Sequence, residues 1–172
     1  GAAPELAPLH ALGGEAWEKA KRKAAQKVRD VAAELLALYA QREARGGTAF
    51  AYDRNLYEQF AAAFPFEETP DQLRAIEAVI ADLASAKSMD RVVCGDVGFG
   101  KTEVALRAAF VAAMAGVQVA LVCPTTLLAR QHFTNFVERF KGFPINIGRL
   151  SRLVPAAEAQ RTRDGLAAGT ID

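Results

Sequence analysis

The sequence has few of the residues from which disulfides and metal centres are built. Its 172 residues include two cysteines and two histidines, and Cys94 and Cys123 each close a short apolar run. Zinc needs about four ligands at close spacing, whereas His10, His132 and these thiols come from distant places in the chain. We therefore expect no zinc site, and we expect reduced cysteines buried as small hydrophobic side chains.

The sequence also lacks an excess of charge and a long apolar run. Its 21 basic and 20 acidic residues leave a net charge of +1, so any nucleic-acid contact would need a local patch. No apolar run reaches the roughly 18 residues of a membrane span, and the start is unlike a secretory signal. Because 51% of the residues are hydrophobic, we expect a globular cytoplasmic protein with one sizeable core and no membrane contact.

Both ends of the sequence look interrupted. It starts with Gly1 instead of Met, and Asp172 follows Ile171 where a new apolar run begins. Residues 1–14 hold two prolines and a Gly-Gly pair, which is typical of an irregular segment. We expect residues 1–14 to be the end of an upstream domain or an artificial extension.

A long helix is predicted over residues 15–47. From Glu15 to about Arg45 there is no glycine or proline, and apolar residues recur every three or four positions. Unbroken, it would measure about 46 Å, a length that suits a connector. Its basic residues could contact a nucleic acid or an acidic partner, but the interleaved acidic residues favour a solvated face.

Residues 48–172 predict one α/β domain. The aromatic residues that precede Pro65 are expected in the core. Helices are then predicted near 70–86, 101–115, 127–140 and 156–168, and strands near 91–94, 118–123 and 145–150. Such repeated βα units predict a mostly parallel sheet covered by helices.

The most specific motif follows the first predicted strand. It reads Gly95, Asp96, Val97, Gly98, Phe99, Gly100, Lys101 and Thr102. This spacing, between an apolar strand and an apolar-periodic helix, is that of a P-loop. Its glycines let backbone N–H groups surround phosphate oxygens, and the helix N-terminus adds partial positive charge. We expect Lys101 to contact nucleotide phosphates and Thr102 to bind Mg²⁺, both in catalytic roles.

Two flanking segments each allow two interpretations. Thr69 and Gln72 can form a capping box with Pro70 at the first helical position, or Gln72 can recognise adenine while Phe64 or Phe66 stacks on the ring. Sequence chemistry alone favours capping. In the second segment, threonines can cap the next helix, or their hydroxyls can hold a nucleic-acid phosphate. Its candidate residues are Pro124, Thr125, Thr126 and Gln131.

Three segments in order resemble the opening motifs of the superfamily 2 motor in bacterial transcription-repair coupling factors. They are FPFEETPDQ, MDRVVCGDVGFGKTEVALRAAF and LVCPTTLLARQHFTNF. The branch-migrating helicase RecG has a similar loop, but the lead-in over residues 9–42 resembles the coupling factors. The resemblance implies a RecA-like fold, truncated on its C-terminal side, from an ATP-driven double-stranded DNA translocase. Such a translocase displaces stalled RNA polymerase and recruits excision-repair proteins.

The resemblance also implies roles for individual residues. It implies that ATP and Mg²⁺ bind at residues 95–102 with Glu103, that Gln72 recognises adenine, and that the Pro124 to Gln131 segment contacts the DNA backbone. The chain departs from the family pattern, because no Asp-Glu pair follows an apolar strand and the arginines of a second motor lobe are missing. We therefore expect nucleotide binding without hydrolysis. A missing central strand should also make the chain marginally stable or oligomeric.

Other classes of function stay open. A RecG-like helicase would share the P-loop and the flanking motifs. A self-contained small-molecule kinase or GTPase would show its own catalytic carboxylate and base-specificity motif, and we find neither. A non-enzymatic module would dock RNA polymerase or a repair protein through the long helix, so it would lose that partner without residues 1–45.

Overall fold

The computed structural model describes residues 14–172, which form six α-helices and no β-strand. The chain divides into two compact units, of which the first ends at Arg45 and the second covers residues 46–172. His10 and nearly all of the segment 1–14, predicted as the end of an upstream domain, lie outside the described residues. No helix among residues 14–172 has the length and apolar character to span a membrane.

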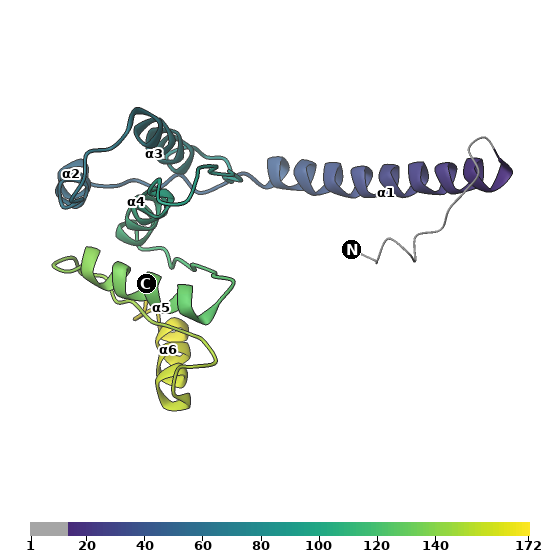
Figure 1. Ribbon diagram of the computed structural model, residues 1–172. Helices are drawn as coiled ribbons and strands as arrows, with labels where there is room; N and C mark the ends of the chain where they lie inside the picture. Colours follow the sequence, from purple (N-terminus) through teal and green to yellow (C-terminus); the bar gives the residue numbers. More distant parts are fainter. Residues whose placement is uncertain (1–13) are drawn as a thin grey trace. The chain divides into compact units, whose positions relative to one another are not determined.

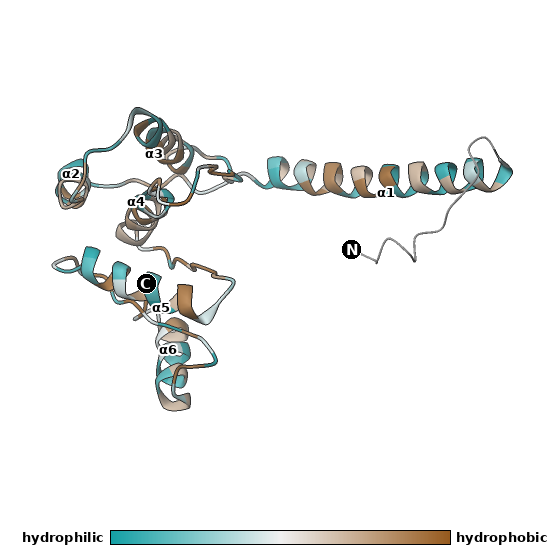
Figure 2. Cartoon of the chain, in the orientation of Figure 1, coloured by the Kyte–Doolittle hydropathy of each residue, from teal (hydrophilic) through white to brown (hydrophobic). Residues whose placement is uncertain are grey.

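The described part of the first unit is one helix, α1, over Glu15–Arg45 (Figure 1). The helix that we predicted from the absence of glycine and proline is therefore observed. Glu15 and Glu18 lie in its first turn, and Arg42 and Arg45 lie in its last, as the helix dipole favours. None of its residues is buried, and hydrophilic and hydrophobic residues are mixed along its length (Figure 2).

The second unit contains the four helices that we predicted after Thr69. They are α3 over Pro70–Leu83, α4 over Lys101–Met114, α5 over Thr126–Arg139 and α6 over Ala156–Ala168. A further helix, α2, covers Arg54–Ala62 and was not predicted. Its start signal is Asp53, whose carboxylate accepts hydrogen bonds from the N–H groups of Asn55 and Leu56.

Helix α4 lies between two apolar clusters of this unit. On one side the ring of Phe110 stacks on Phe60 of α2 with centroids 4.3 Å apart, and both side chains are fully buried. On the other side Val104 and Val111 belong to a cluster with buried residues of α3, and α2 and α3 both pack against α4. The expectation that the aromatic segment contributes to the core holds for Phe60. Because α4 follows the P-loop directly, this packing fixes the base of the loop.

The predicted parallel sheet is not formed among residues 14–172. Segments 91–94, 118–123 and 145–150 lie outside the helices but form no strand. A ladder needs several consecutive backbone hydrogen bonds between neighbouring segments, whereas the backbone hydrogen bonds that link segments 118–123 and 145–150 pass through Asp172. Val119 N–H donates to the Asp172 carbonyl at 2.6 Å, and Asp172 N–H donates to the Asn146 carbonyl at 2.9 Å. The sheet prediction was wrong for this reason.

The unpaired segments leave apolar side chains in solvent. Val92 is 84% exposed and Val122 is 90% exposed. Cys94 is also exposed, so its predicted burial was wrong, while Cys123 is partly buried. A cavity of about 240 Å³ is lined by apolar residues of segments 118–123 and 145–150 and of α4, α5 and α6.

Candidate nucleotide-binding site

The loop before α4 ends at a helix N-terminus that has no side-chain cap. Gly100 occupies the cap position with a left-handed backbone. Helices α2, α3 and α5 instead begin with a capping oxygen from Asp53, Thr69 and Thr125. The first amides of a helix need an acceptor from outside the helix. An uncapped N-terminus behind a glycine-rich loop is therefore suited to an anion such as phosphate.

Gly100 cannot be replaced by another residue without a local rearrangement. Its φ angle is +69°, which favours glycine. A Cβ atom there would also lie 2.4 Å from Nε2 of Gln72. The last glycine of the motif is therefore needed for the turn, and another residue there would also displace the Gln72 amide from its present position.

Lys101 lies over the loop, as the motif predicts. Its ammonium group donates hydrogen bonds to the carbonyls of Gly95 at 2.5 Å and Asp96 at 2.6 Å. Lys101 is exposed and the adjacent Thr102 is partly buried. The ammonium group and the helix N-terminus together supply the positive charge that phosphate oxygens require.

The remaining residues of the predicted motif differ in exposure. Val97 is 99% exposed and Phe99 is 58% exposed, and Gly98 has a φ of +88°. Glu103 is buried, and its carboxylate accepts hydrogen bonds from two arginines instead of facing the loop residues.

Gln72 joins the start of α3 to the P-loop. Its N–H donates to the Thr69 hydroxyl at 3.2 Å, and its Oε1 accepts from the Thr69 N–H at 2.7 Å, which confirms the predicted capping box with Pro70 at its start. Its Nε2 also donates to the Phe99 carbonyl at 2.7 Å. A pocket is lined by Thr69, Gln72, Gly95, Asp96, Lys101 and neighbouring residues. The structure therefore places Gln72 beside the loop while it caps α3.

Phe64 and Phe66 lie together just before this cap. Their rings are edge to face with centroids 5.5 Å apart, and Phe66 is 72% exposed. Neither ring is among the residues that line the pocket shared by Gln72 and the loop. A stacking role for either ring stays a prediction.

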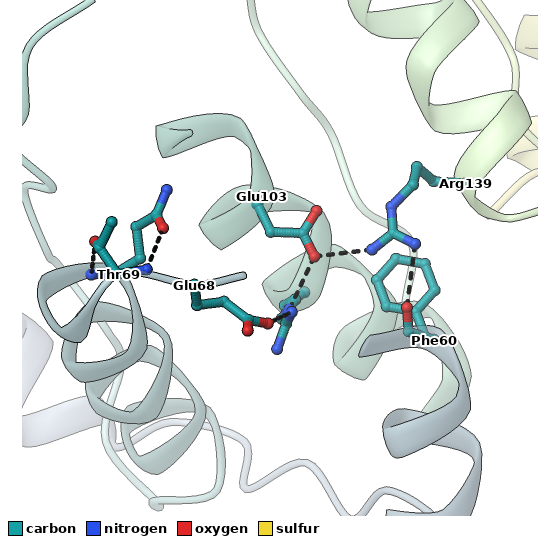
Figure 3. Close-up of polar contacts among 7 residues, drawn as sticks. Phe60, Glu68, Thr69, Glu103 and Arg139 are labelled. Atoms are coloured by element: carbon teal, nitrogen blue, oxygen red, sulfur yellow. Dashed lines mark hydrogen bonds and ion pairs between the residues drawn. The ribbon is translucent and has the colours of Figure 1, made fainter. Parts of the chain in front are cut away.

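A largely buried ion-pair network lies along one face of the P-loop helix (Figure 3). Glu103 Oε1 accepts from Arg107 Nε at 2.9 Å and from Arg139 Nη2 at 2.8 Å. Arg107 Nη2 also donates to the Glu68 carboxylate, and Arg139 Nη1 donates to the Phe60 carbonyl at 3.1 Å. The network connects α2, the segment before α3, α4 and α5.

The pKa values of two members of this network, Arg107 and Glu68, are shifted by their surroundings. Burial alone lowers the pKa of Arg107, but hydrogen bonds with Glu103, Tyr57 and Glu68 outweigh it and raise the pKa above its usual value. The pKa of Glu68 is lowered by a hydrogen bond from its own backbone and, after a smaller opposing effect of burial, by Arg107. Sequence reasoning missed Arg107, Glu68 and Arg139. The four-residue spacing of Glu103 and Arg107 was the one local signal for the network.

The predicted DNA-contacting residues gather at the first turns of α5. The Thr125 hydroxyl accepts from the Leu128 N–H at 3.2 Å, so the capping interpretation is confirmed. Pro124, Thr125 and Gln131 are exposed, and Thr126 is partly buried. None of them lines the pocket beside the P-loop. Their contact with a nucleic acid stays a prediction.

The donor set fits a nucleotide better than a metal held by protein alone. Residues 14–172 contain no group of three or more histidine, cysteine, aspartate and glutamate side chains that could hold a metal ion. A divalent cation at Thr102 would thus take most of its ligands from phosphate and water, as Mg²⁺ commonly does. The uncapped helix, Lys101 and Thr102 together fit a nucleotide with Mg²⁺.

A family profile and individual proteins both match the sequence of this chain. The sequence profile of the family described as "DEAD/DEAH box helicase" matches residues 69–169. The chain is 59% identical over its whole length to the transcription-repair-coupling factor of Haemophilus influenzae and 56% identical to that of Escherichia coli. The chain spans only 15% of the length of each of these two relatives.

A solved structure also resembles the chain. It is described as "Structure of RecG bound to three-way DNA junction", and its TM-score is 0.73 at 37% sequence identity. The similarity covers 79% of this chain and 19% of that one. The same P-loop helicase fold therefore accommodates most of the chain, although residues 14–172 form no strand.

Proposed function

The chain belongs to the DEAD/DEAH box helicase family, and from this premise we propose that it is the ATP-binding part of a cytoplasmic, ATP-dependent double-stranded DNA translocase. The matched profile covers more than half of the chain. The observation that carries the proposal is the N-terminus of α4, which has no side-chain cap. Lys101 lies at this N-terminus and contacts the preceding loop, and Gln72 contacts the same loop. Identity to coupling factors supports a translocase that couples transcription to DNA repair.

We assign the phosphates of ATP to the loop of residues 95–102. Backbone N–H groups of the loop and Lys101 bind them, and the Thr102 hydroxyl holds the accompanying Mg²⁺. The ion, when bound, neutralises phosphate charge. Lys101 would exchange its bonds to the Gly95 and Asp96 carbonyls for bonds to phosphate oxygens. Because the Glu103 carboxylate is held by Arg107 and Arg139, Glu103 contributes to the site through its backbone.

We assign recognition of adenine to Gln72. An amide oxygen accepts two hydrogen bonds and an amide nitrogen donates two. The bonds to Thr69 and Phe99 use one of each, which leaves one acceptor and one donor position for a base. This pair matches the adenine edge, which has an N6 donor next to an N7 acceptor, but not guanine, which has O6 and N7 acceptors. Phe64 or Phe66 is proposed to stack on the ring.

The other proposed contacts lie at α5 and α1. Exposed Pro124, Thr125 and Gln131, with Thr126, are proposed to hold the DNA backbone. Helix α1 is proposed as the connector to a domain that contacts RNA polymerase, and excision-repair proteins are proposed partners of the whole protein. A RecG-like branch-migrating helicase is the alternative function, and the similarity of this chain to the solved RecG structure favours it. The sequence identity to the coupling factors extends over the whole of this chain, α1 included, and favours a coupling factor.

The test is thermal unfolding of the 172-residue chain with and without ATP and Mg²⁺. A ligand that binds only the folded state at about 100 times its Kd stabilises it by about 2.7 kcal/mol. We expect this shift in the wild type and none in Lys101→Ala. The matched control is Lys141→Ala, which removes another exposed lysine from the same unit. An equal shift in Lys101→Ala would place the phosphates elsewhere. Hydrolysis by this chain is expected to stay at background, with or without DNA.

A further inference from the structure

Arg107 holds the segment that precedes Gln72 at both of its ends. Its guanidinium carbon lies 6.0 Å from the centre of the Phe64 ring, and its Nη2 donates to the Glu68 carboxylate. These contacts bracket residues 64–68, which include both aromatic rings proposed to stack on the base. The sequence spacing relates Arg107 to Glu103 but not to residues 64–68.

Arg107 is itself held rigidly in the P-loop helix. Its side chain is 5% exposed, and its Nε donates to Glu103, whose side chain is also 5% exposed. Glu103 accepts a second hydrogen bond from Arg139 of α5. Two carboxylates and two guanidinium groups therefore balance their charges, and the planar guanidinium of Arg107 keeps one orientation. A contact from Glu68 to Arg107 thus joins that segment to a fixed point on α4.

Glu68 is connected to Gln72 through the backbone of Thr69. It precedes Thr69, whose N–H donates to Gln72 Oε1 and whose hydroxyl caps α3 (Figure 3). The same Gln72 amide contacts the loop through its Nε2, which donates to the Phe99 carbonyl. The start of α3 is therefore attached to the loop by the bond from Gln72 to Phe99, and to the P-loop helix by the bond from Arg107 to Glu68. Two attachments fix both the distance and the orientation of the Gln72 amide, which one attachment does not.

We propose that Arg107 is a positioning residue for base selection, and that it acts through Glu68 to hold the Gln72 amide where it distinguishes adenine from guanine. The inference rests on the proposed role of Gln72 in recognising adenine. Arg107 does not touch the nucleotide. Its effect should therefore appear in the preference between nucleotides and not in the binding of phosphate, which Lys101 and the loop provide.

The experiment measures nucleotide hydrolysis by the native full-length gene product with ATP and with GTP, in the presence of double-stranded DNA. Glu68→Ala removes the carboxylate that reaches Arg107, whereas Arg107 keeps its partner Glu103. Glu68→Gln, which can still accept a hydrogen bond, is the milder second variant. Glu67→Ala is the matched control, because it removes the adjacent exposed carboxylate. Gln72→Ala reports whether base recognition depends on Gln72, and thermal melting verifies that each variant is folded at the assay temperature.

We expect Glu68→Ala to lower the ratio of kcat/KM for ATP to that for GTP by about fivefold, a size typical of coupling between neighbouring groups. The loss should lie in KM for ATP, with kcat and the GTP constants nearly unchanged, and Glu68→Gln should be intermediate. A role in folding alone would affect both nucleotides equally. If the ATP-to-GTP ratio of kcat/KM falls in Gln72→Ala but is unchanged in folded Glu68→Ala or Glu68→Gln, the positioning role of Arg107 is overturned while adenine recognition by Gln72 stands. An unchanged ratio in Gln72→Ala would overturn the proposed adenine recognition as well.

Discussion

Helix α1 has 31 residues and none of them is buried, whereas α4 has 14 residues of which seven are buried. The two helices therefore depend on different interactions. In α1, the uninterrupted run of helix-forming residues and the charges at its ends act locally. In α4, the two apolar clusters and the buried ion pairs act from α2, α3 and α5.

This difference matters for where a functional site can be built. A helix with no buried residue, such as α1, gains little stability from packing and therefore opens more readily than a buried helix. A phosphate site needs its groups held within a fraction of an ångström, and α4 offers that because Phe110, Val111 and Glu103 anchor it inside the unit. The proposed role of α1 as a connector does not require groups to be held that precisely.

The largest effect is expected when an aromatic anchor of α4 is removed. Phe110 is fully buried and stacks on Phe60, so Phe110→Ala should destabilise the second unit by about 3–5 kcal/mol. Leu35→Ala in α1 is the control, because Leu35 is 51% exposed, and it should change stability by no more than about 0.5 kcal/mol. Guanidinium unfolding followed by near-ultraviolet circular dichroism measures both. Similar losses in the two variants would mean that α1 is packed as firmly as α4.

A smaller and strictly local effect is expected from glycine in α1. Ala24→Gly replaces an exposed alanine in the middle of the helix and should cost about 1 kcal/mol of helix stability. Hydrogen exchange with mass spectrometry should show faster exchange in peptides of residues 15–45 and unchanged exchange in α4. The conservative control is Ala24→Gln, since glutamine is a good helix former. Faster exchange in α4 would show that the two units are energetically coupled.

The smallest effect concerns the charge of Glu68. Because its pKa in the folded protein lies below the ordinary 4.5, the charged carboxylate stabilises the fold above about pH 4.5, and this contribution disappears as the pH falls through the lowered pKa. Glu68→Gln should therefore be less stable than the wild type at pH 7, by about 1 kcal/mol or less. The difference should vanish in acid. Urea unfolding between pH 7 and pH 3 measures it.

The control for this pH series is Glu67→Gln, which changes the adjacent exposed carboxylate. A pH-dependent difference of equal size at both positions would mean that net charge is responsible, and not the hydrogen bonds that the Glu68 carboxylate accepts from its own backbone and from Arg107.

The parts of the site that could be predicted from sequence are those in which the interacting groups are close in the chain. The P-loop spacing from Gly95 to Thr102 and the cap formed by Thr69 and Gln72 lie within eight residues or fewer. The network around Glu103 could not be predicted, because its partners are far apart in sequence. Arg107 and Glu68 are separated by 39 residues, and Arg139 and Glu103 by 36. Only folding brings those charges together.

The sequence by itself determined α1, α3, α4, α5 and α6, because helical hydrogen bonds join residues four apart and the start and stop signals lie within the same segment. It also determined the P-loop and the family to which the chain belongs. Tertiary structure alone decided whether residues 91–94, 118–123 and 145–150 become strands, since each strand takes its hydrogen bonds from a neighbour elsewhere in the chain. It also decided that Gln72 contacts Phe99 and that Arg107 holds Glu68, because both contacts depend on how α3 packs against α4.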